Sequence, residues 1–177
     1  AADSGTPLEQ GAMRMFAHIP EISKGLTAFA GSLKQNRSLP DRLVELVRLR
    51  VAFHNQCRSC MAIRYKDGQE DGITEDLVCS LEKPMEADNL SDAEKAAIQY
   101  GELFATNHLA INDDIYDNLR KYFNESEIVE LSMTVAFFVG FGRLAASYHM
   151  VEELPESFQA NEKEILTPWG NDSIIVR

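Results

Sequence analysis

Two cysteines three positions apart are the residues in this chain most able to do chemistry. Cys57 and Cys60 form a Cys-x-x-Cys pair, and Glu45 lies twelve positions before the first cysteine. If the pair begins a helix, both thiols share one face near the first-turn amides and the positive end of the helix dipole. Such surroundings stabilise a thiolate, and the charge of Arg58 or Arg64 can lower a thiol pKa further. The pattern is therefore typical of thiolate-based redox chemistry.

A Cys-x-x-Cys pair also has two other interpretations, a metal half-site and packed core thiols. A structural zinc site needs two more soft or imidazole ligands. The third cysteine, Cys79, lies in the apolar run LVCSL and is expected to pack, and the histidines are scattered, at His18, His54, His108 and His149. Packing of the pair itself stays open, because cysteine is often buried. We expect dithiol and disulfide redox chemistry, with no metal and no cofactor.

Composition bounds the class of protein. The 177 residues fit a single domain. A formal net charge of -11 and an isoelectric point near 4.8 argue against a protein that binds the phosphate backbone of nucleic acid. No stretch of eighteen uninterrupted apolar residues and no basic and apolar leader pattern are visible, so we expect no membrane association and a cytoplasmic location.

Hydrophobic periodicity predicts helices along most of the chain. Pro20 separates the first two, and Ser91 with Glu94 forms a capping box that opens a long one. Gly140 and Gly142 would allow close helix contact within the most apolar helix. The predicted helices cover residues 8–18, 21–36, 41–54, 57–72, 74–81, 91–107 and 112–123, and a last one that begins at Asn124 or Ser126 and runs to 150. With no alternating β-branched run in between, the expected fold is all-α, with seven or eight helices.

The last part of the chain differs from the rest. We assign residues 1–150 to one helical domain and residues 151–177 to a C-terminal tail, because the helical period is lost there, with one short helix at most within 152–164. Trp169 and the apolar residues 174–176 are a large apolar surface for a free tail. We expect the tail to pack on its own core or on a neighbouring subunit.

The segment around the cysteines resembles the alkylhydroperoxidase D-like branch of the carboxymuconolactone decarboxylase family. Its specific part is Glu45 followed by Cys57 and Cys60, with LRVAFHNQ directly before the pair. The flanks HIPEISKGLTAFAGSL and SDAEKAAIQYGELFA are similar to other helices of that family, and the resemblance covers about residues 15–150. It implies a single-domain helical bundle of the alkylhydroperoxidase D-like type that forms a homo-oligomer, a trimer or a hexamer.

The resemblance also implies an antioxidant peroxidase activity. Cys60 matches the peroxidatic cysteine, which attacks a hydroperoxide substrate and becomes a sulfenic acid, and Cys57 matches the cysteine that resolves it. An external dithiol reductant would return the disulfide to the dithiol state. Glu45 matches the carboxylate of the family's proton relay. This cycle agrees with general thiol chemistry, since the attack needs a thiolate and the departing alkoxide needs a proton.

Two positions depart from the family pattern. Where the fullest motif has histidines, one directly before the second cysteine and one four residues after it, this chain has Ser59 and Arg64. Arg64 can stabilise the thiolate of Cys60 by charge, but it cannot act as a general base near neutral pH. His54 is a candidate substitute in the relay and His149 a more remote one, although a lone histidine on an apolar helix more often has a structural role.

Two alternative functions are consistent with the sequence. One is lactone decarboxylation, the activity that gives the wider family its name, although the Cys-x-x-Cys pair speaks against it because that reaction uses no redox cysteines. The other is a non-enzymatic helical oligomer whose thiols sense oxidants or merely pack. Turnover with a dithiol reductant separates an enzyme from a sensor.

Overall fold

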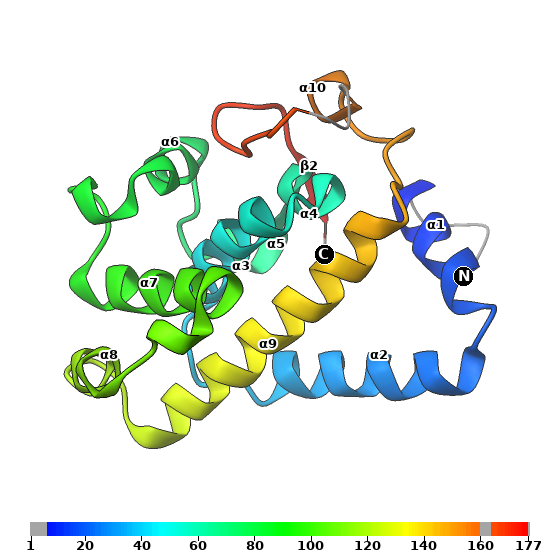
Figure 1. Cartoon of the computed structure of the whole chain (residues 1–177). Helices are drawn as coiled ribbons and strands as arrows, with labels where there is room; N and C mark the ends of the chain where they lie inside the picture. The colour runs from blue at the N-terminus through cyan, green and yellow to red at the C-terminus, as the bar shows by residue number, and fades with distance from the viewer. Residues whose placement is uncertain (1–6, 160–163, 177) are drawn as a thin grey trace.

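The computed structural model describes residues 7–159 and 164–176 as a mostly helical assembly with one small sheet (Figure 1). Within these residues there are ten α-helices, three short 3-10 helices and two strands. The elements before the middle of the chain are α1 (Pro7–Phe16), α2 (Pro20–Gln35), α3 (Asp41–Asn55), α4 (Arg58–Ala62), β1 (Ile63–Tyr65), α5 (Lys66–Glu70), α6 (Glu75–Cys79), η1 (Ser80–Glu82) and η2 (Pro84–Glu86). They are followed by α7 (Asp92–Thr106), η3 (His108–Ala110), α8 (Asp113–Leu119), α9 (Glu125–Ser147), α10 (Glu156–Gln159) and β2 (Ile174–Val176).

Helix α3 is the centre of the fold. It packs against α7 on one side and α9 on the other, and α2 lies at an angle to α9 and touches it (Figure 1). Ten of its fifteen residues are buried, which is why its sequence shows a broad apolar face rather than a narrow stripe. Because α3 ends where the Cys-x-x-Cys segment begins, the main core holds the cysteines in place.

The predicted helix starts are confirmed where a capping signal stands in the sequence. The Ser91 hydroxyl accepts a hydrogen bond from the Glu94 amide, and the Glu94 carboxylate accepts one from the Ser91 amide, as a capping box requires. Asn124 and Glu127 make the same exchange at the start of α9. Local hydrogen bonding is sufficient to fix these two boundaries.

The predicted continuous helix over residues 57–72 is wrong in its middle. Residues 63–65 form strand β1, which pairs in parallel with β2, so that Ile63 lies opposite Ile174 and Tyr65 opposite Val176. The fold class is therefore mostly helical with a two-stranded sheet, rather than purely helical. The strand that pairs with β1 lies more than a hundred positions further along the chain, so no periodicity within residues 57–72 could reveal β1.

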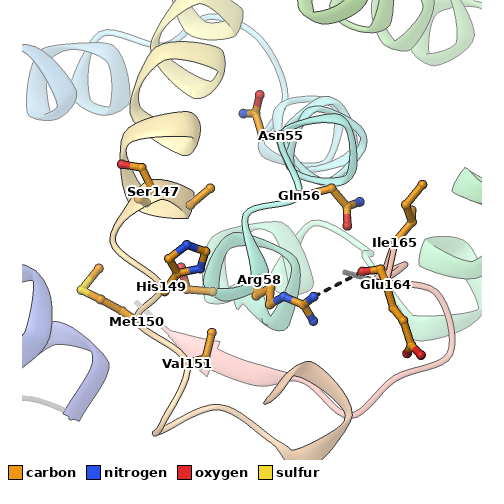
Figure 2. Close-up of a pocket in the computed structure, with 12 residues that line it drawn as sticks. Asn55, Gln56, Arg58, Ser147, His149, Met150, Val151, Glu164 and Ile165 are labelled. Carbon is orange, nitrogen blue, oxygen red and sulfur yellow. Dashed lines mark hydrogen bonds between the residues drawn. The ribbon is translucent and has the colours of Figure 1, made fainter. Parts of the chain in front are cut away.

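The C-terminal segment lies on the helical domain of its own chain. Phe158 and Leu154 are buried in a second apolar cluster with Met61 of α4. The Arg58 guanidinium donates to the carbonyl of Glu164 at 3.2 Å (Figure 2), and the Gln56 side-chain amide exchanges two hydrogen bonds with the backbone of Leu166, both 3.0 Å long. The short helix is α10, while residues 160–163, where the prediction also allowed helix, lie outside the described part.

Helix α9 is long and apolar enough to cross a bilayer by length and composition, but only that test points to a membrane. Core helices of globular domains pass it too, and 39% of the apolar window of α9 is buried inside the molecule against α3, α7 and other elements. Its outer face is nonetheless mostly apolar. The exposed apolar residues along that face are Val129, Met133, Ala136, Gly140 and Leu144, and the charged Arg143 is exposed beside them.

Candidate active site

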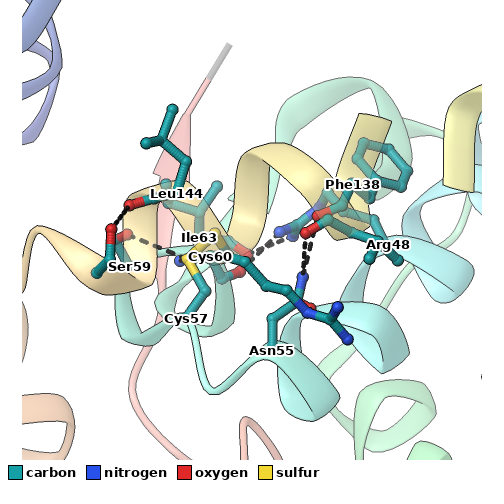
Figure 3. The surroundings of a disulfide bond; sticks show 11 residues. Arg48, Asn55, Cys57, Ser59, Cys60, Ile63, Phe138 and Leu144 are labelled. Atoms are coloured by element: carbon teal, nitrogen blue, oxygen red, sulfur yellow. Dashed lines mark hydrogen bonds between the residues drawn. A yellow bond between two sulfur atoms is a disulfide. The ribbon is translucent and has the colours of Figure 1, made fainter. Parts of the chain in front are cut away.

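Cys57 and Cys60 are joined by a disulfide at the start of α4 (Figure 3). Gln56 ends α3 in the left-handed conformation, with φ at 49°, and this turns the chain so that Cys57 becomes the N-cap of α4. The Cys57 sulfur accepts a hydrogen bond from the Cys60 amide at 3.3 Å. Cys57 is fully buried and Cys60 only partly, so an incoming molecule has access to the second sulfur.

Cys60 lies in the wall of an apolar cavity of about 430 Å³. Helices α1, α2 and α9 supply most of the lining, and four of the lining residues are phenylalanines: Phe16, Phe137, Phe138 and Phe141. Stacking of Phe137 on Phe141, with ring centroids 5.4 Å apart, fixes part of this wall. The cavity can take a bulky apolar group next to the sulfur of Cys60.

A buried ion pair joins α3 to the cysteine segment. Arg48 donates to both carboxylate oxygens of Glu45, at 2.6 and 2.7 Å, and also to the carbonyls of Cys60 at 2.6 Å and Ile63 at 2.7 Å. Burial lowers the pKa of Arg48, but the Glu45 carboxylate and Tyr65 together raise it by more, so the net pKa lies above the ordinary value and the guanidinium stays charged. Arg48 also faces the Tyr65 ring at 4.8 Å.

Glu45 does not line the cavity that contains Cys60. Besides Arg48, it accepts a hydrogen bond from the Tyr65 amide at 3.0 Å. It faces a neighbouring cavity of about 350 Å³, and the two cavities share Arg48 and Tyr65 in their walls. Glu45 is therefore linked to Cys60 through Arg48, which binds both the Glu45 carboxylate and the Cys60 carbonyl.

Arg64, predicted to stabilise the thiolate of Cys60, has other partners. It is fully buried, forms two hydrogen bonds to the Glu75 carboxylate and donates to the carbonyls of Met61 and Pro168. It does not line the Cys60 cavity. The cation that shares this cavity with Cys60 is Arg48, which is not among the site residues predicted from the sequence.

His54 lies on a different face of α3. Its Nε2 atom is 3.4 Å from a Glu102 carboxylate oxygen, at ion-pair distance but outside hydrogen-bond geometry. The His54 ring, together with Arg50, overcomes desolvation and lowers the pKa of Glu102 to about 2. His54 lines neither of the cavities next to the Glu45–Arg48 pair, so the structure does not bring this candidate together with Cys60.

A third cavity, more polar than the one that contains Cys60, lies on the other side of α4 and has a volume of about 350 Å³ (Figure 2). His149 lines it, in the left-handed conformation with φ at 46°, together with Arg58 and Ser147. Ser59 lines both this cavity and the apolar one. The position where the family motif has a histidine thus connects the two spaces.

Asn55 is a site residue that the sequence identified only as a helix end. Its side-chain amide donates to the Phe138 carbonyl at 3.0 Å and accepts from Arg143, which ties α3 to α9 beneath the apolar cavity. A Cβ at Gly142 would lie 2.5 Å from this amide, so the predicted close approach at Gly142 is confirmed. At Gly140 a Cβ would meet nothing within 4 Å, and the prediction is wrong there.

Cys79 takes no part in this site. It is an exposed free thiol at the end of α6, so the expectation that it packs is wrong. The neighbouring Leu77 and Val78 are the residues that turn inward. Within the described residues, no group of three or more His, Cys, Asp or Glu side chains converges to hold a metal ion.

Comparison with known proteins agrees with this geometry. A family model described as "Carboxymuconolactone decarboxylase family" matches residues 20–103, which include the whole Glu45 to Cys60 segment. Over these residues the chain is similar to the carboxymuconolactone decarboxylase family. The resemblance predicted from the sequence is thereby confirmed, and the fold is that of the alkylhydroperoxidase D-like proteins.

Two relatives are similar to part of this chain. The uncharacterized protein YdfG of Bacillus subtilis is 28% identical over 92 residues, which cover 51% of this chain and 63% of that protein. An uncharacterized protein of Mycobacterium tuberculosis is 30% identical over 121 residues, which cover 67% of this chain but 42% of its own length. The chain thus spans less than two thirds of these relatives.

The crystal structure of an uncharacterized peroxidase-related protein from Ralstonia eutropha, described as an alkylhydroperoxidase AhpD core, shares the fold. It superposes with a TM-score of 0.64 at 18% identity, covering 82% of this chain and 76% of that one. At this level of identity the superposition establishes the fold alone.

Proposed function

We propose that this protein is a thiol peroxidase that reduces organic hydroperoxides through Cys60 and Cys57. The observation that carries the proposal is the Cys57–Cys60 disulfide with its more accessible sulfur in an apolar cavity. The peroxidase-related description of the Ralstonia protein supports the same class of activity. The proposed role is antioxidant, and the reaction needs no metal or organic cofactor.

The cycle begins with the dithiol form. The Cys60 thiolate attacks one oxygen of the hydroperoxide; the O–O bond breaks, an alkoxide leaves and takes a proton, and Cys60 becomes a sulfenic acid. The Cys57 thiolate then attacks the Cys60 sulfur, forming the S–S bond and releasing hydroxide, which is protonated to water. An external dithiol reduces the disulfide by two successive thiol exchanges. One peroxide and one dithiol are consumed per cycle.

Arg48 is the cation proposed to act on Cys60. It binds the backbone carbonyl of Cys60 and lines the same cavity, so its charge favours a thiolate at this position. Glu45 is proposed to hold Arg48 and the Tyr65 amide in place, since both of its oxygens are engaged by them. The contribution of Glu45 to the proton relay would then be indirect.

The shape of the cavity favours organic over hydrogen peroxide. Phenylalanine side chains from α1 and α9 can bury the apolar part of an organic hydroperoxide, and burial stabilises binding by about 25 cal/mol per Å² of apolar surface. Hydrogen peroxide has no apolar part and gains nothing from this wall. We expect cumene hydroperoxide to oxidise the reduced protein faster than hydrogen peroxide does.

The test is a thiol titration before and after one equivalent of each peroxide. Wild type should lose two thiols per chain, and Cys60→Ser should form no intramolecular disulfide; Cys79→Ser is the matched control and should behave as wild type apart from its missing thiol. No loss of thiols with either peroxide would contradict the proposal. Catalytic turnover with dithiothreitol distinguishes an enzyme from a sensor that reacts only once.

We also propose that the protein acts as a cytoplasmic homo-oligomer, a trimer or a hexamer. The apolar outer face of α9, defined above, and the exposed Ile22 and Phe29 of α2 support self-association, because a surface of this kind is usually covered. Sedimentation equilibrium of the full chain measures the stoichiometry, and a monomer at all concentrations would contradict it.

A further inference from the structure

The sulfur of Cys57 is enclosed by neutral hydrogen-bonding groups. Cys57 is fully buried and lines neither the apolar nor the polar cavity. Its sulfur lies 3.3 Å from the amide nitrogen of Cys60 and 3.6 Å from the hydroxyl oxygen of Ser59. A disulfide sulfur carries no hydrogen, so the Ser59 hydroxyl must be the donor in this contact.

Ser59 follows Cys57 by two residues and lies next to its sulfur. It belongs to α4, is 8% exposed, and lies between the two cavities. The charged and titratable groups around it line the cavity walls: Arg48, Glu9 and Tyr65 on the apolar side, and Arg58, His149 and Glu164 on the polar side. The contacts of the Cys57 sulfur itself are with a hydroxyl and an amide.

We propose that Ser59 is a positioning residue whose hydroxyl donates a hydrogen bond to the Cys57 sulfur when that sulfur carries negative charge. The inference rests on the dithiol cycle proposed above. Cys57 is negatively charged twice in that cycle. It is the nucleophile when the disulfide closes, and it is the leaving group when the external dithiol breaks the disulfide.

Both steps balance around this sulfur. On closure, the Cys57 thiolate forms the S–S bond while the S–O bond of the Cys60 sulfenic acid breaks and hydroxide leaves. On reduction, a thiolate of the dithiol attacks Cys60, the S–S bond breaks, and its electron pair stays on Cys57. A buried thiolate is costly without a donor, because burial disfavours the charged form. The Ser59 hydroxyl offsets that cost without being consumed.

The test measures the ionisation of Cys57 without any peroxide. In the full chain carrying Cys60→Ser and Cys79→Ser, Cys57 is the sole thiol. The ultraviolet absorbance of its thiolate is followed against pH, with the cysteine-free chain as blank. Three further variants are compared in this background: Ser59→Ala removes the donor, Ser59→Thr keeps it, and Ser147→Ala is the matched control.

Ser147 is a suitable control because its hydroxyl lines the same polar cavity but donates to the Leu144 carbonyl. Ser59→Ala should raise the pKa of Cys57 by about one unit, the size expected for a lost hydrogen bond to a charged group. Ser59→Thr should restore the parent value, and Ser147→Ala should leave it unchanged. An unchanged pKa in Ser59→Ala, with native circular dichroism, would overturn the proposal.

A second measurement covers the catalytic step. In the chain with both redox cysteines, Ser59→Ala should close the disulfide about tenfold more slowly after peroxide, so that dimedone traps more Cys60 sulfenic acid. Equal trapping in wild type and Ser59→Ala would count against the role. If peroxide oxidises no thiol even in wild type, the proposed function fails, while the ionisation of Cys57 still decides the role of Ser59.

Discussion

The arginines on the two sides of α4 bind different parts of the chain. On the side of the apolar cavity, Arg48 binds the Cys60 carbonyl and pairs with Glu45 of its own helix. On the side of the C-terminal segment, Arg58 and Arg64 donate to backbone carbonyls of that segment, at Glu164 and Pro168. Two arginines closer in sequence to the cysteines thus hold the tail, and a more distant one binds the carbonyl of Cys60 and shares its cavity.

This difference teaches that sequence distance to a cysteine is a poor guide to electrostatic influence. Arg64 lies four residues after Cys60, which on a continuous helix would put the two side chains on one face. Strand β1 begins before Arg64, so that relation is lost, and the side chain is directed to Glu75 and the tail instead. The comparison predicts different losses when each arginine is changed.

The largest effect is expected at Arg64. Arg64→Met should destabilise the protein by about 3 kcal/mol, because it leaves the buried carbonyls of Met61 and Pro168 without their donor and removes the ion pair with Glu75. Urea unfolding measures the loss, and limited proteolysis of the tail should become faster. Arg120→Met, which removes exposed ion pairs only, is the control and should change little. Equal stability of the two variants would break the comparison.

A smaller effect, on reactivity, is expected at Arg48. Arg48→Lys keeps a charge near Glu45 but lacks the planar group that reaches the carbonyls of Cys60 and Ile63. Oxidation of reduced Cys60 by cumene hydroperoxide, followed by stopped-flow fluorescence, should slow about tenfold because the sulfur is held less well. Arg50→Lys, on the Glu102 face of the same helix, should keep the wild-type rate. If Arg50→Lys slows the oxidation of Cys60 as much as Arg48→Lys does, Arg48 has no specific role at the cavity.

The smallest effect is expected in the pH dependence of stability, through Glu102, which lies beside His54 on the other face of α3. Because the pKa of Glu102 is lowered to about 2 from its ordinary value of 4.5, its contribution to stability is full above about pH 4.5 and is lost as the pH falls towards 2. Solvent screening of this partly exposed group limits the contribution to about 1 kcal/mol. Urea unfolding of wild type and Glu102→Gln should differ at pH 6 and converge near pH 2. If Glu102→Gln also slows Cys60 oxidation, His54 belongs to the site after all.

Much of the fold could be predicted from local signals. The capping boxes at Ser91 and Asn124 and the proline at position 20 fix helix starts through bonds within one or two turns. The Glu45 and cysteine spacing predicted the family, and the pair is joined as a disulfide. Strand β1 and the exposure of Cys79 could not be predicted, because both depend on what the rest of the chain covers.

The sequence by itself determined the helices, the family and the dithiol pair, since periodicity, caps and spacing are properties of neighbouring residues. Only the tertiary structure decided which charges meet the cysteines. Arg48 reaches Cys60 because the chain turns after α3 and places α4 beside it. Arg64 lies elsewhere because its segment pairs with strand β2 of the tail and its side chain binds the Pro168 carbonyl. A buried cation goes where its hydrogen bonds can be satisfied, and for Arg64 one of those acceptors, the Pro168 carbonyl, lies 104 positions further along the chain.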